Sequence, residues 1–130
     1  MLWDIRGTSS SGRTIVYKQY SKLKITTHEN AKAAAQDDVR ETVNLYNAHG
    51  PCVVVMDAKD VVFRPAIFTY VRACIDNNMP EAHALHVVNC SKWVKTLTKF
   101  ALRLLPTNPS RLLFFHNTTY GEIENTVKAI

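Results

Sequence analysis

The feature that most constrains the fold of this chain is a regular alternation of strand-like and helix-like segments. Residues 52–56 are apolar without a break, which is typical of a central strand covered on both faces. A helical stripe of apolar residues precedes this run over residues 31–46, and another follows it over residues 67–75. Strands joined by helices are linked by right-handed crossovers. The pattern therefore predicts an α/β fold whose mostly parallel sheet has four to five strands, with helices on its faces.

The segments before the central strand predict further strands and one long helix. Residues 2–5 and 14–20 predict strands, and the alternation at residues 23–25 predicts a short edge strand. Thr26 and Glu29 have the spacing of a capping box, which predicts that a helix begins there. The charged residues that we expect on the solvent-exposed side of this helix are Asp37, Asp38, Arg40 and Glu41.

Glycine, proline and threonine predict the remaining helix boundaries. Gly50 predicts the end of the first long helix. Pro65 suits the first turn of the next helix, which Pro80 prevents from continuing. Thr119 and Glu122 have the spacing of a second capping box and predict the start of the last helix.

A helix predicted at residues 92–104, between strands at 84–88 and 111–115, has two contrasting faces. Its basic residues recur at spacings of three and four: Lys92, Lys95, Lys99 and Arg103. Its large apolar residues recur in the same way on another face: Trp93, Leu97, Phe100 and Leu104. One interpretation is a packed crossover helix with a solvated basic face. The other is that this face meets an anionic membrane or an acidic partner, because lysines beside Trp and Phe are typical of interfacial helices. Nucleic acid is disfavoured, since the aromatic side chains lie away from the lysines.

Composition narrows the setting in which the protein works. The formal net charge of +5 allows acidic partners without requiring one. The first residues carry charges and form no long apolar run, so we expect no signal peptide, and no apolar run is long enough to span a membrane. We therefore expect a cytoplasmic protein, with membrane contact limited to the periphery. Three separated cysteines without metal-ligand spacing predict buried thiols: Cys52, Cys74 and Cys90.

The candidate catalytic residues form no recognisable constellation. Asp57 and Asp60 follow the central strand, at the edge where open α/β sheets bind ligands. We interpret them as turn and helix-capping residues, and a phosphate- or metal-dependent role is the alternative. His83 and His86 point to opposite faces of a strand, so they cannot share a metal ion, and with His116 they are interpreted as structural. The sequence contains no phosphate-binding loop, dinucleotide fingerprint or nucleophile elbow, so we expect no enzyme activity and no cofactor.

Several short motifs, taken in order, resemble the CRAL-TRIO lipid-binding domain family. They are Gly12-Arg13-Thr14-Ile15-Val16-Tyr17, Val53-Val54-Val55-Met56-Asp57, Met79-Pro80-Glu81-Ala82, His86-Val87-Val88-Asn89 and Arg111-Leu112-Leu113-Phe114-Phe115. The resemblance covers roughly residues 12–118. Family positions are changed at Met79, Ala82 and Ser91, and the stretch before Pro80 is short. In that shortness the chain is similar to the BCH-type branch of the family.

The length predicts a single domain over residues 1–130, and because the last predicted helix is still running at Ile130, we expect the chain to be part of a longer protein. The resemblance implies that this domain binds a phospholipid or another apolar ligand. In this family a pocket lies between the sheet and a mobile helix. The residues that the resemblance places on the pocket wall are Trp93, Leu97, Phe100, Leu104, Val55 and Val88. Those that it turns toward an anionic membrane are Lys92, Lys95, Lys99 and Arg103. The BCH-type branch implies instead a protein-interaction scaffold that binds a small GTPase or dimerises.

Overall fold

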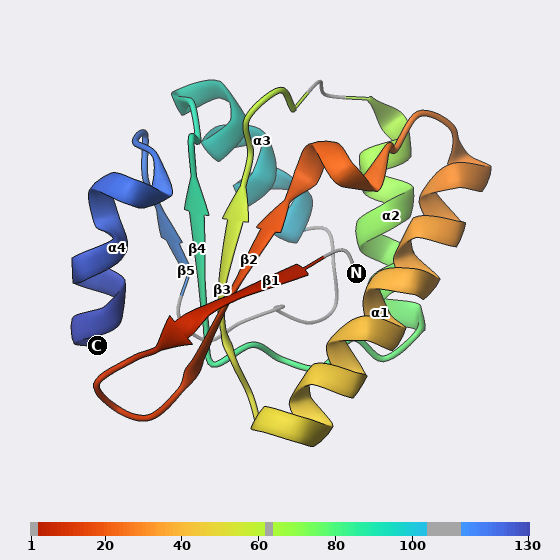
Figure 1. Ribbon diagram of the computed structural model, residues 1–130. Helices are drawn as coiled ribbons and strands as arrows, with labels where there is room; N and C mark the ends of the chain where they lie inside the picture. Colours follow the sequence, from red (N-terminus) through yellow and green to blue (C-terminus); the bar gives the residue numbers. More distant parts are fainter. Residues whose placement is uncertain (1–2, 62–63, 104–112) are drawn as a thin grey trace.

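A five-stranded sheet lies at the centre of the computed structural model, which describes residues 3–61, 64–103 and 113–130, and of residues 101–103 only the backbone. Its strands are β1 (Trp3–Thr8), β2 (Thr14–Gln19), β3 (Val53–Asp57), β4 (Ala84–Val88) and β5 (Leu113–Phe115), in that order across the sheet (Figure 1). β1 runs antiparallel to β2, and the other neighbouring pairs are parallel. The predicted α/β class with a mostly parallel sheet is therefore confirmed.

Helices cover both faces of this sheet. They are a 3₁₀ helix η1 (Tyr20–Leu23) and the α-helices α1 (His28–His49), α2 (Pro65–Asp76), α3 (Lys92–Arg103) and α4 (Tyr120–Ala129). Figure 1 shows α1 and α2 side by side at the right of the sheet and α4 at the left. Successive residues of a strand point to opposite faces, so β2, β3 and β4 supply one set of side chains to the α1–α2 side and another to α4.

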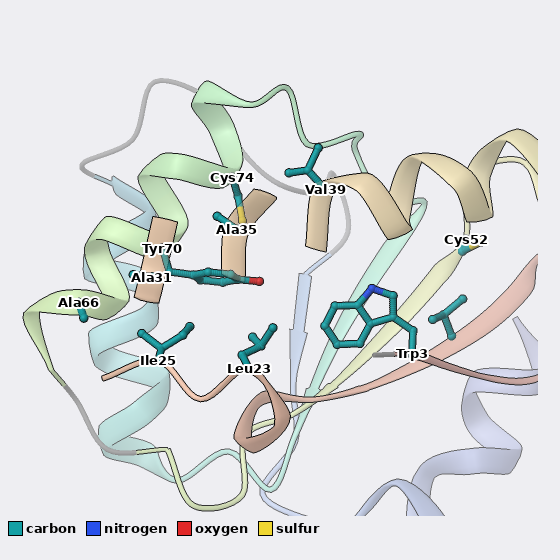
Figure 2. Packing of buried hydrophobic residues seen from close by; sticks show 11 residues of the cluster. Trp3, Leu23, Ile25, Ala31, Ala35, Val39, Cys52, Ala66, Tyr70 and Cys74 are labelled. Atoms are coloured by element: carbon teal, nitrogen blue, oxygen red, sulfur yellow. The ribbon is translucent and has the colours of Figure 1, made fainter. Parts of the chain in front are cut away.

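An extensive buried cluster joins α1, α2 and the sheet (Figure 2). Ala31 and Ala35 of α1 are completely buried. Their small side chains let α1 and α2 pack closely. Trp3 of β1 is 1% exposed and closes one end of the cluster, while Tyr70 of α2 lies within it. On the other face Tyr120 and Val127 of α4 pack against β2, β3 and β4.

The predicted edge strand at residues 23–25 is wrong. The chain forms η1 instead and then turns at Lys24, whose φ is 52°. This turn lets both Leu23 and Ile25 enter the α1–α2 cluster, where each is 7% exposed. Burying two such side chains contributes roughly 1.5–3 kcal/mol each.

The helix boundaries follow local sequence closely, with two corrections. The capping box of α1 is one residue later than predicted: Thr27 Oγ1 accepts from the Asn30 amide, and the Asn30 side chain accepts from the Thr27 amide. Gly50, at φ 75°, ends α1, and Pro65 occupies the first turn of α2, as predicted. Thr119 precedes α4 as predicted, but its side chain makes no capping hydrogen bond.

Candidate functional site

A cavity of about 220 Å³ lies on the α1–α2 side of the sheet. Its apolar wall comes from four elements: Val54 and Met56 of β3, Leu85 and Val87 of β4, Ile67 and Val71 of α2, and Val94 and Thr98 of α3. A concave, mainly apolar site with a few polar groups is the usual form of a small-molecule site. Because α3 supplies one wall, movement of this helix would change access to the cavity.

The sheet floor of this cavity differs by one residue from the prediction. Val55 and Val88 were expected on the pocket wall, but both pack on the opposite face in the cluster beneath α4. Side chains alternate along a strand, so the neighbours Val54 and Val87 face the cavity instead. The apolar run at residues 52–56 gave no indication of which face of the strand meets a cavity, because both faces are equally hydrophobic.

The orientation of α3 also differs from the prediction. Trp93 is 67% exposed and Phe100 is 55% exposed, so these two side chains lie outside the cavity, and Leu97 is half-buried. Val94 and Thr98, four residues apart, face the cavity in their place. Val94 also packs beside Val87 of β4. The predicted ligand contacts of Leu97 stay a prediction, and Leu104 lies outside the described residues.

The outward side of α3 combines positive charge with exposed aromatic rings. We call Lys92, Trp93, Lys95, Lys99 and Phe100 the α3 outer face, since all five are exposed. The ammonium groups of Lys95 and Lys99 each lie 5.7 Å from the centre of the Phe115 ring on β5. Attraction between these cations and the ring holds the middle of the helix over the sheet edge. The side chain of Arg103, also predicted to be basic and exposed, lies outside the described residues.

A buried ion pair forms one end of the cavity, and sequence reasoning missed it. Asp38 was expected in solvent, but it is completely buried, and its Oδ1 lies 2.9 Å from Nζ of Lys18. Tyr70 donates a hydrogen bond to the same carboxylate, while the hydroxyl of Thr42 donates to the main-chain oxygen of Asp38 at 2.7 Å. Burial, and then the negative charge of Asp38, raise the pKa of Tyr70 well above its ordinary value, so Tyr70 stays a neutral donor. The signal in the sequence was a lysine two residues after Val16, on the buried face of β2.

Asp57 joins three strands at the carboxyl edge of the sheet. Its carboxylate accepts hydrogen bonds from the Tyr17 hydroxyl, from Nδ2 of Asn89 at 2.9 Å and from the Lys59 amide at 2.9 Å. Burial by itself would raise the pKa of Asp57, but these hydrogen bonds more than offset it and hold the pKa below its ordinary value. The predicted turn role fits the bond from Lys59, whereas the predicted capping role is wrong, because Arg64 precedes α2.

The structure also brings together two histidines that are far apart in the chain. Nδ1 of His86 lies 3.0 Å from Nε2 of His116, and the His86 ring stacks on Phe114. Burial lowers the pKa of both imidazoles, and the neighbouring His116 adds to the effect on His86, whose pKa is about 4. Among the described residues no group of three or more histidine, cysteine or acidic side chains could hold a metal ion.

Comparison with known protein families identifies the arrangement. The family model of the CRAL/TRIO domain matches residues 4–129, nearly the whole chain. The chain belongs to the CRAL/TRIO domain family. This confirms the resemblance seen in the sequence motifs, and the α/β sheet with helices on both faces is consistent with it. A search of curated proteins gave no match.

Membership of the CRAL/TRIO family gives the cavity a chemical context. Domains of this family bind lipids or small hydrophobic molecules and are generally transfer proteins rather than enzymes. Within the described part of the chain, the cavity beside α3 has a mainly apolar wall. No helix in the described part of the chain is long and apolar enough to cross a bilayer.

Proposed function

We propose that this CRAL/TRIO domain carries a small hydrophobic ligand in the cavity beside α3 and docks on anionic membranes through the α3 outer face. The observation that supports it most directly is that one helix serves both surfaces. Val94 and Thr98 line the cavity, while Trp93 and Phe100 stand in solvent among lysines. Contact between the outer face and a membrane would therefore act directly on a wall of the ligand site.

The composition of the α3 outer face suits the interface of an anionic bilayer. Each lysine near such a surface contributes about 1 kcal/mol of attraction, so three give roughly 3 kcal/mol at ordinary salt. Trp and Phe add the burial of apolar area in the headgroup region. Both rings are more than half exposed in the free protein, so little protein packing is lost when they enter the lipid.

Vesicle sedimentation tests membrane docking. We expect binding to vesicles that contain phosphatidylserine, weaker binding to pure phosphatidylcholine, and loss of binding in the double variant Lys95→Glu/Lys99→Glu. The matched control is Lys22→Glu/Lys32→Glu, which changes the net charge equally at exposed positions on η1 and α1. Equal loss in both double variants would show that only total charge matters and would contradict docking through α3.

A pair of threonine variants on α3 tests ligand carriage. Thr98→Phe places a ring in the cavity, whereas Thr96→Phe places the same ring on an exposed side of the helix. We expect a hydrophobic probe such as cymene to raise the melting temperature of the wild type and of Thr96→Phe, but not of Thr98→Phe. A shift of equal size in all three proteins would mean that the probe binds elsewhere.

A protein-interaction scaffold, binding a small GTPase or a second copy of the chain, is the second candidate. It is favoured by the exposed aromatic pair, because Trp and Phe are frequent anchors of protein interfaces. Light scattering tests self-association, and titration with purified GTPases tests the other partner. Complexes abolished by Trp93→Ala/Phe100→Ala, in a protein that binds no vesicles, would support this candidate over membrane docking.

A further inference from the structure

We propose that two copies of the chain pair along the outer edge of β1, as antiparallel strands related by a twofold axis at Ile5, so that their two sheets join into one. This edge lies apart from the cavity and from the α3 outer face, and the pairing depends on neither ligand carriage nor membrane docking. Three properties of β1 support it: its position at the edge of the sheet, the exposure of its side chains, and a charge pattern that is complementary to itself.

β1 is an edge strand of the five-stranded sheet (Figure 1). Within the described part of the chain it pairs with β2 alone, and outside that ladder no main-chain hydrogen bond joins residues 3–8 to another described residue. Alternate residues of an antiparallel edge strand direct their N–H and C=O groups away from the sheet, where a further strand can bind them. The outer edge of β1 therefore offers main-chain groups to a second chain.

The side chains of β1 leave this edge accessible. Asp4, Ile5 and Arg6 are exposed, and Ile5 is 48% exposed. Residues 3–8 include no lysine and no proline, which many natural edge strands use to block pairing. Ile5 is β-branched and suits a strand. Two Ile5 side chains directly opposite each other would bury apolar surface that the single chain exposes.

The charges on either side of Ile5 make the edge complementary to a second copy of itself. Nη2 of Arg6 lies 3.8 Å from Oδ2 of Asp4, so the two side chains share one side of the strand, and this exposed ion pair is weak enough to exchange partners. In an antiparallel pair centred on Ile5, Asp4 of each copy lies opposite Arg6 of the other. Opposite charges in opposed positions stabilise a strand pair, whereas like charges destabilise it. Parallel pairing in register would oppose like charges at both positions, so the pattern favours the antiparallel arrangement.

Two features of Arg6 limit the strength of this pairing. Arg6 is the extra residue of a β-bulge between Ile5 and Gly7, which twists the strand and ends the regular ladder there. Its guanidinium also lies 4.6 Å from the centre of the Tyr17 ring, a contact that competes with pairing. The new ladder is therefore short, and small interfaces are typical of weak, transient complexes. We expect a dimer that dissociates on dilution.

Sedimentation velocity of the whole chain, from about 5 µM to about 500 µM, tests the pairing. We expect a reversible equilibrium between monomer and dimer. Asp4→Arg and Arg6→Asp each place like charges opposite one another, and each should weaken the dimer at least about tenfold. The double variant Asp4→Arg/Arg6→Asp exchanges the two charges and should restore it. An equal mixture of the two single variants should also dimerise, since every opposed pair then carries opposite charges.

Two controls separate this edge from other causes. Trp93→Ala/Phe100→Ala changes α3 alone and should dimerise as the wild type does, while urea unfolding shows whether each variant is folded. If the charge variants do not fold, Ile5→Lys, which opposes two lysines at the twofold axis, should make the chain monomeric.

Three results would overturn the inference. They are a wild type that stays monomeric at every concentration, a dimer that Asp4→Arg and Ile5→Lys leave intact, and folded single variants whose mixture does not dimerise. A dimer lost only in Trp93→Ala/Phe100→Ala would also overturn it and would assign self-association to the α3 outer face. None of these results bears on ligand carriage, which the cavity variants test separately.

Discussion

Removal of the Lys18 ammonium should be one of the most damaging single changes in this domain. Lys18→Met keeps the length and much of the volume of the side chain, but leaves the carboxylate of Asp38 fully buried without its cation. Breaking a buried ion pair in this way costs about 3–5 kcal/mol. Tyr70 still donates a hydrogen bond to the carboxylate of Asp38, so we expect the lower end of that range, about 3 kcal/mol.

Urea unfolding followed by tryptophan fluorescence measures this loss. The Trp3 ring lies 4.2 Å from the Lys18 ammonium and is buried, whereas Trp93 is already exposed in the folded protein, so the change in emission on unfolding comes mainly from Trp3. Lys32→Met is the matched control, because Lys32 is exposed on α1 and its loss should cost less than about 0.5 kcal/mol. The double variant Lys18→Met/Asp38→Leu should recover most of the stability, since apolar pairs replace buried ion pairs at little cost. A loss below about 1 kcal/mol, or a double variant as unstable as the single one, would refute this reasoning.

Three further predictions concern the opposite face of the sheet and the end of α1. The pKa of His86 in the folded protein is about 4, below its ordinary value of 6.5. The folding stability that the neutral imidazole contributes is therefore complete above pH 6.5 and is lost as the pH falls toward 4, by about 3 kcal/mol at most. His86→Phe should flatten this part of a stability–pH curve. Asp57→Asn should lower the free energy of unfolding by about 1–3 kcal/mol, because a neutral amide replaces the carboxylate that accepts hydrogen bonds from Tyr17 and Asn89. Since the pKa of Asp57 is lowered in the folded protein, the difference in stability between wild type and variant should shrink in urea titrations as the pH falls through that pKa. Gly50→Ala should cost about 1–3 kcal/mol in thermal unfolding, because φ 75° with ψ −177° is a backbone conformation essentially restricted to glycine, and an unchanged melting temperature would contradict this account of the helix end.

The elements that the sequence predicted well are those set by local hydrophobic periodicity and by residues that begin or end helices. The apolar run at residues 52–56 became the central parallel strand β3, and Gly50 and Pro65 mark helix boundaries as expected. These features depend on a few neighbouring residues, so they can be deduced without knowing what packs against them. Such reasoning places a helix start only to within about one residue. Thr26 and Thr27 are chemically equivalent, and in the structure Thr27 caps α1.

The residues that line the cavity could not be predicted from sequence spacing, for a physical reason. Periodicity tells which residues share a face, but not which face meets a neighbour, a cavity or solvent. Trp93 and Phe100 share a stripe as predicted, yet α3 rests on the adjacent stripe of Val94 and Thr98. For the same reason Val55 was predicted on the floor of the cavity, whereas Val54 lies there in the structure.

The sequence by itself determined the α/β alternation, the parallel direction of the central strands and the two-sided composition of α3, because each of these depends on residue spacing. Only the tertiary structure decided that Asp38 meets Lys18 across the core and that this pair closes one end of a small cavity. Those residues are twenty positions apart, on a helix and a strand. Their contact depends on how α1 lies across the sheet, and that position is set by packing of the whole core at once.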